Sequence, residues 1–150
     1  MEFNHFVSIR GQHLKEFRCS TAGDMRGGYN TVTVKKQDDT HAHITFEKAD
    51  THCQDPEISE YLADISVLNE LENVIRKEKM NFWNRKKFTD MFVADGANTS
   101  YSFRFDKAHV DFSSQIYPQK YRDKLNSFND IISNSVANAE KLSCKAGLSD

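Results

Sequence analysis

The most constraining feature of the sequence is a regular alternation of apolar and polar residues in its second half. Tyr101, Phe103 and Phe105 alternate with serine and arginine, and after a turn at 106–108 the apolar positions continue to Phe112. A period of two residues places one kind of side chain on each face of a strand. The pattern therefore predicts a β-hairpin with one buried face and one polar face.

Four more strands are predicted in the first third of the chain, at residues 3–9, 17–21, 31–34 and 42–46. The last of them alternates most regularly, with Ile44 on one side and His41 and His43 on the other. Short connections between successive strands favour antiparallel pairing. Together with the hairpin, these segments predict an antiparallel sheet of about five or six strands.

Two amphipathic helices are predicted to cover this sheet. The first begins at Asp55 and Pro56, which suit the N-cap and the first helical position, and it ends among cations at Lys79. Apolar residues recur along it at spacings of three and four, as on one face of a helix. The second helix opens at Pro118 and extends to about Leu142.

The length of 150 residues fits one folded unit, and no internal repeat or linker divides it. We expect a single α+β domain over residues 1–150, made of an antiparallel β-sheet with two amphipathic helices packed on one face. A loose tail is expected after about residue 143. Ile58, Leu62 and Phe103 are among the positions predicted for the core.

Charge and cysteine content restrict the environment of the protein. The formal net charge of -2 gives no overall attraction to nucleic acid or to an anionic membrane. Cys19, Cys53 and Cys144 are far apart and odd in number, which favours reduced thiols. No secretory signal and no apolar run of membrane length is visible. We therefore expect a cytoplasmic protein without membrane contact, unless a leader peptide precedes this sequence in the native protein.

The spacing of four side chains suggests one candidate metal site. His41 and His43 share one face of a predicted strand, and His109 and Asp111 share one face of another. If those strands were neighbours, the four side chains could form the tetrahedral ligand set that zinc accepts. The sequence does not set the strand order, so a metal-dependent enzyme with zinc as its cofactor stays an alternative. No other catalytic or cofactor-binding residues are identified.

A basic and aromatic cluster lies at residues 76–87, where six cations surround Phe82 and Trp83. Such a surface could contact phosphates and stack on bases. The competing interpretation is a helix C-terminus with its expected cations, and Phe82 and Trp83 inside the core. Because the chain as a whole is slightly acidic, nucleic acid is not expected as a partner.

The stretch from Leu68 to Ile132 resembles a domain of small uncharacterised bacterial proteins. The shared pattern is a helix, an aromatic-Trp pair, Asp-Gly, a strand hairpin, and an aromatic-Pro pair before a final helix. In this sequence the aromatic-Trp pair is Phe82-Trp83, the Asp-Gly is Asp95-Gly96, the hairpin runs from Tyr101 to Phe112, and the aromatic-Pro pair is Tyr117-Pro118. The chain departs from this pattern at Lys107-Ala108, where a second Asp-Gly is expected. The resemblance implies helices on an antiparallel sheet and no particular activity.

The favoured function is a non-catalytic binding or protein-interaction module. The sequence supplies enough apolar residues for a core and no convergent set of catalytic groups. We expect another protein as the partner, bound through the open face of the sheet or through a sheet edge.

Overall fold

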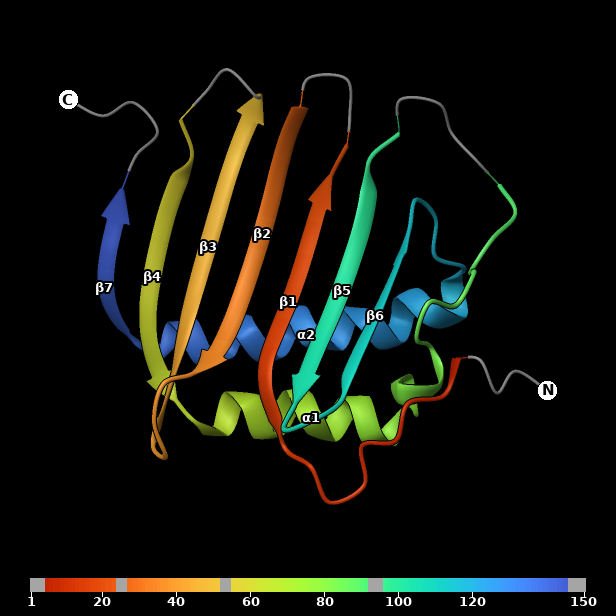
Figure 1. Cartoon of the computed structure of the whole chain (residues 1–150). Helices are drawn as coiled ribbons and strands as arrows, with labels where there is room; N and C mark the ends of the chain where they lie inside the picture. Colours follow the sequence, from red (N-terminus) through yellow and green to blue (C-terminus); the bar gives the residue numbers. More distant parts are fainter. Residues whose placement is uncertain (1–4, 24–26, 52–54, 92–95, 146–150) are drawn as a thin grey trace.

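Seven strands pair edge to edge in the order β6-β5-β1-β2-β3-β4-β7, and every neighbouring pair is antiparallel (Figure 1). The computed structural model describes residues 5–23, 27–51, 55–91 and 96–145. The strands are β1 (Leu14–Ala22), β2 (Gly27–Lys36), β3 (His41–Thr51), β4 (Glu57–Asp64), β5 (Asn98–Phe105), β6 (His109–Ser114) and β7 (Glu140–Lys145). Predictions that involve Phe3, Cys53, Asp95 and the tail after residue 145 concern positions outside these ranges.

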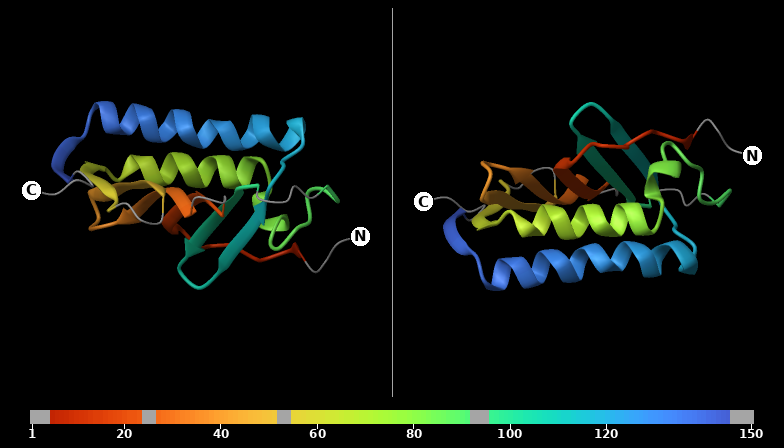
Figure 2. Two further views of the ribbon diagram at one scale, coloured as in Figure 1. Left: turned by 90° about the horizontal axis from the view of Figure 1, so that it is seen from above. Right: turned by 90° about the horizontal axis from the view of Figure 1, so that it is seen from below.

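Two helices, α1 (Ser66–Lys77) and α2 (Gln119–Ala137), run across the same face of the sheet, at a steep angle to the strands. Figure 2 shows the sheet from its ends, with both helices on one side and the other side uncovered. The predicted α+β fold, an antiparallel sheet with two helices on one face, is therefore confirmed. Within the described ranges, no helix combines the length and the apolar composition that a bilayer crossing requires.

The core lies between the sheet and the helices and is built mainly from rings. Phe17 on β1 pairs with Phe103 on β5 on one side and with Val34 on β2 on the other, and all three are fully buried. Phe128 of α2 packs onto Phe17, with ring centroids 4.8 Å apart. The alternation seen in the sequence therefore places every second residue of the central strands under the helices.

The predicted helix that starts at Asp55 is wrong in its first half, because residues Glu57–Asp64 form strand β4. Along β4, Tyr61 lies opposite buried Ile44, whereas Leu62 lies opposite His43 on the uncovered face. A strand with apolar residues on both faces shows the same three- and four-residue spacings as a helix. The predicted core positions Ile58 and Leu62 are accordingly only half-buried.

The predicted second helix is too long at its C-terminal end. It stops at Ala137, and Glu140–Lys145 form β7, an edge strand beside β4. The segment predicted to end a helix and begin a loose tail is thus a seventh strand, one more than expected. Two hydrogen bonds from the Asn138 and Ala139 backbone N–H groups to carbonyls of the last helical turn close α2 before the strand begins.

Residues 5–9 of the first predicted strand are not part of the sheet. Residues 5–13, here called the N-terminal strap, run past the short 3-10 helix η2 (Met80–Phe82) instead. The Val7 N–H donates to the Asn81 carbonyl at 2.8 Å, and the Asn84 N–H donates to the His5 carbonyl at 3.1 Å. The apolar residues of the strap are thus explained by contacts with a loop, which period-two reasoning does not distinguish from a strand.

Candidate binding face

The face of the sheet away from the helices carries a row of hydroxyl groups. Strand register places Ser113 of β6, Ser100 of β5, Ser20 of β1 and Thr31 of β2 side by side. The Ser20 and Thr31 hydroxyls are hydrogen-bonded at 2.8 Å. We call these four residues the hydroxyl row; they form a polar floor across four adjacent strands.

The next row across the same face contains an unpaired guanidinium. Asp111, Ser102, Arg18 and Thr33 are successive neighbours on β6, β5, β1 and β2. Arg18 is exposed, and among the described residues no acid or carbonyl binds its guanidinium. Ser102 is hydrogen-bonded to the Nε2 of His109 at 2.7 Å. This row therefore offers both a free cation and a hydroxyl to solvent.

A third row is formed by charged side chains. Glu16 of β1 lies between Arg104 of β5 and Lys35 of β2, and both cations are exposed whereas Glu16 is half-buried. Arg18, on the same strand as Glu16, is exposed as well. We call Arg18, Arg104 and Lys35 the cationic centre.

The other acids on this side of β3 and β4 are engaged by neighbours. The Tyr29 hydroxyl donates to Glu47 at 2.5 Å, and this hydrogen bond to an anion raises the pKa of Tyr29 above its usual value. The carboxylate of Glu60 lies 3.2 Å from the Nε2 of His43. In the described part of the chain, no acid forms an ion pair with Arg18, Arg104 or Lys35, although Glu16 lies between the last two.

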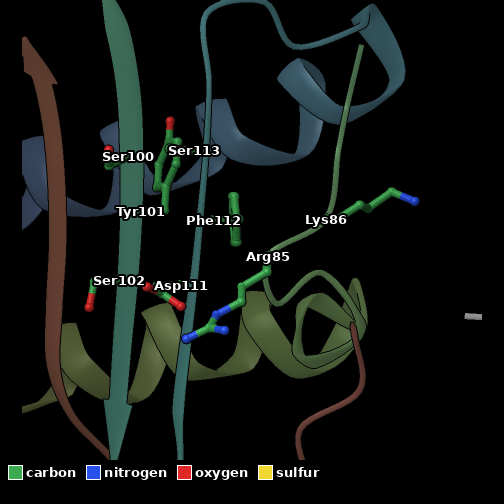
Figure 3. A pocket seen from close by; sticks show the side chains of 8 residues that line it. All are labelled: Arg85, Lys86, Ser100, Tyr101, Ser102, Asp111, Phe112 and Ser113. Carbon is green, nitrogen blue, oxygen red and sulfur yellow. The ribbon is translucent and has the colours of Figure 1, made fainter. Parts of the chain in front are cut away.

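Three adjoining hollows cover this face. They have volumes of about 420, 370 and 510 Å³. The first and second share Ser102, and the second and third share Arg18. Figure 3 shows the first hollow, over β5 and β6, with Ser100, Ser102 and Asp111 on the strands and Arg85 at its rim. The three hollows together extend from β6 to β3.

Arg85 reaches the first hollow from outside the sheet. Its backbone N–H donates to the carbonyl of Asp111 at 2.7 Å, so the segment that carries it covers part of the outer edge of β6. The backbone φ of Arg85 is 54°, in the left-handed region that favours glycine. Its guanidinium points across β6 towards Asp111 (Figure 3).

The structure does not bring the four predicted metal ligands together. His41 and His43 lie on β3, and His109 and Asp111 lie on β6, with three strands between them. At about 4.8 Å per strand, the two pairs are about 19 Å apart, whereas a zinc ion bonds its ligands at about 2 Å. Within the described ranges, no three histidine, cysteine, aspartate or glutamate side chains are grouped so that they could hold one ion.

The basic and aromatic cluster at 76–87 is divided by the fold. Trp83 is buried, with edge-to-face contacts to Phe88, Phe112 and Tyr121. Phe82 is 48% exposed and packs on Phe6. Stacking of a base on Trp83 would therefore require the core to open.

Sequence reasoning included Arg85 in the basic and aromatic cluster at 76–87 as a possible phosphate contact, but it did not identify Arg18 or the hydroxyl row as a site. The signal was present in part, because Ser100, Ser102 and Thr33 occupy the polar positions of predicted strands. These polar positions could not be assembled into one surface from the sequence, because the pairing of β1 with β5 depends on the strand order, which the sequence does not give.

Comparisons with protein-family models, with curated proteins and with solved structures found no match. The resemblance of Leu68 to Ile132 to small bacterial domains stays a prediction, and the function has to be argued from the geometry of the open face.

Proposed function

We propose that this protein is a non-catalytic binding module that holds an acidic segment of another protein on the open face of its sheet. The observation that carries the proposal is the cationic centre: Arg18, Arg104 and Lys35 project from three adjacent strands, while Glu47 and Glu60 are bound by neighbouring side chains. Complementary charge steers such a partner to this face and selects against basic ones.

The size of the face supports a chain segment as the ligand. From β6 to β3 the adjoining hollows cover about 19 Å, the length of about five or six extended residues. The hydroxyl row supplies donors and acceptors for the backbone of such a segment over four of these strands, from β6 to β2. A small molecule would fill only one of the hollows.

The Ser102–His109 pair has the spacing of a nucleophile and its base, but its setting supports binding. His109 is exposed, and in the described part of the chain no carboxylate orients its second ring nitrogen. The hydrogen bond fixes the Ser102 hydroxyl at the junction of two hollows, where it can contact a ligand.

The proposal is tested by titrating ¹⁵N-labelled protein with the peptide acetyl-Glu-Glu-Ser-Glu-Glu-amide and following backbone amide shifts. We expect shifts in β1, β2 and β5, weaker binding at higher salt, and about tenfold weaker binding for R18Q/R104Q. The matched control R122Q removes an exposed cation from α2 and is expected to leave binding within about twofold.

A peptide with lysine in place of glutamate serves as the control ligand. Equal binding of the lysine peptide, or shifts confined to α1 and α2, would overturn the proposal.

A further inference from the structure

We propose that the junction of the first and second hollows, around Ser102, is a subsite for a phosphate group carried by the acidic segment, that is, for a phosphorylated hydroxyl side chain. This inference rests on the proposed function. Its basis is the placement of two arginines: Arg85 lines the first hollow, Arg18 lines the second, and Ser102 lines both.

The positions follow from strand register. Arg18 of β1 is the neighbour of Ser102 on β5, and Ser102 is the neighbour of Asp111 on β6. The Arg85 N–H is bound to the carbonyl of Asp111 on the far side of β6. The two arginine backbones are therefore about 14 Å apart, a distance that two extended arginine side chains can close over Ser102.

The chemistry of the lining suits a tetrahedral dianion better than a carboxylate. A phosphate monoester has a charge of about −1.5 to −2 near pH 7 and three strong acceptor oxygens. Each guanidinium can bind two of these oxygens at once. The hydroxyls of Ser100 and Ser102 in the hollow, and of Ser113 beside them, supply further donors that a two-oxygen carboxylate would leave partly unused.

Two charged side chains besides Arg85 line the first hollow. The carboxylate of Asp111 lies on the side from which Arg85 enters and offsets part of the Arg85 charge, while Glu16 and Glu47 line the second and third hollows together with Arg18. Lys86 runs away from the strands, and its ammonium lies 5.8 Å from the ring centre of Tyr121 (Figure 3). The subsite thus depends on the two arginines.

The backbone conformation of Arg85 also supports a ligand-binding role for its side chain. A residue other than glycine in the left-handed region is uncommon and is found often where a side chain has to be held for a ligand. Here the conformation is held by the bond to Asp111 and places a long cationic side chain over an open hydroxyl surface.

The test compares acetyl-Glu-Glu-Ser-Glu-Glu-amide with the same peptide phosphorylated on serine, by isothermal titration calorimetry and amide shifts. We expect the phosphopeptide to bind about tenfold more tightly, with its largest additional shifts at Ser100, Ser102 and Asp111. In R18Q and in R85Q this preference is expected to fall to within about twofold. The control K35Q removes a cation of the cationic centre that lines neither the first nor the second hollow, and it should weaken both peptides equally.

The outcomes separate this inference from the proposed function. Equal binding of both peptides on the open face would overturn the phosphate subsite and leave the acidic-segment proposal standing. Inorganic phosphate that shifts Ser102 and Arg18, while neither peptide binds, would support an anion subsite and overturn the protein segment as its carrier. A phosphate preference unchanged in both R18Q and R85Q would place the phosphate elsewhere and overturn the assignment.

Discussion

Glu72 on α1 accepts a hydrogen bond from the backbone N–H of Leu14 at 2.9 Å, although the two residues are 58 positions apart. The same carboxylate accepts a second bond from the Nε of Arg76 at 2.8 Å. The Arg76 guanidinium also donates to the carbonyls of Ile9 and Gln12. A single ion pair on α1 thus fastens the N-terminal strap and the start of β1 to the helix.

The first prediction concerns this ion pair and its dependence on pH. Burial acts to raise the pKa of Glu72, but the bonds from Leu14 and Arg76 outweigh it and hold the pKa below its ordinary value of 4.5. At pH 7 we expect E72Q to lower the free energy of unfolding by about 2 kcal/mol, because Arg76 loses its partner.

The difference between wild type and E72Q should shrink as the pH falls below 4.5, since a group with a depressed folded-state pKa loses its contribution as it becomes protonated. Urea unfolding at pH 7 and at pH 3.5 to 4 measures this. E70Q, at an exposed position of the same helix, is the control; an equal loss in E70Q would contradict the prediction.

Strands β3, β5 and β6 can be predicted from local sequence patterns, whereas strand β4 cannot. The strict alternation at Tyr101 to Phe112 and at Ala42 to Phe46 corresponds to β5, β6 and β3, because each of these strands has one buried and one polar face. Strand β4 has half-buried apolar residues on both faces, so its pattern fitted a helix equally well. Its choice of conformation comes from pairing with β3 and β7, which is tertiary information.

The candidate site depends on relations that the sequence does not contain. His43 and His109 both face the open side, as the alternation implies, but strand order separates them by three strands. Arg18 and Arg85 are 67 positions apart and line adjoining hollows only because β1 pairs with β5 and the Arg85 backbone binds the edge of β6. Local periodicity gives the face on which a side chain lies and not its neighbours across the sheet.

The second prediction concerns close contact between β2 and β3 at Gly28. A Cβ atom there would overlap the backbone carbonyl of Asp50 and lie 3.0 Å from the carbonyl oxygen of Ala49. Since backbone cannot move aside cheaply, we expect G28A to lower the free energy of unfolding by about 2 kcal/mol. The control N30A, at an exposed position of the same strand, should change it by less than about 0.5 kcal/mol. Chemical denaturation of both variants decides the matter, and a G28A protein as stable as wild type would refute the overlap.

The third prediction compares two phenylalanines. Phe128 is buried and its ring contacts Phe17 and Phe103, so F128A should cost about 3 to 5 kcal/mol through the cavity it leaves. Phe82 is half-exposed against Phe6, and F82A should cost about 1 kcal/mol or less. Thermal and urea unfolding measure both; similar losses for the two variants would mean that α2 does not cover the core as described.

The fourth prediction separates the backbone of Arg85 from its side chain. Glycine removes the cost of the left-handed conformation, so R85G should be as stable as wild type or more stable by about 1 kcal/mol. K87G, at a nearby exposed position without positive φ, should instead lose about 0.5 to 1 kcal/mol. If R85G were less stable than K87G, the side chain of Arg85 would have a structural role beyond ligand contact.

The fifth prediction concerns zinc. Because β3 and β6 are not neighbours, we expect H41A/H43A and H109A/D111A to act independently and neither pair to hold stoichiometric metal. Elemental analysis of protein purified without a nickel column, before and after incubation with zinc, measures this. One zinc per chain that is lost in both double variants would support the metal-dependent enzyme instead.

The pairing of β1 with β5 has a consequence for the newly made chain. Ala22 pairs with Asn98, 76 residues further along, so one side of β1 stays unpaired until that much more polypeptide has emerged from the ribosome. At about 5 to 20 residues per second, this interval lasts about 4 to 15 s. Throughout it, the backbone groups and the Phe17 ring at the middle of the future sheet are open to wrong partners, and a chaperone would be of most use to the nascent protein during this period.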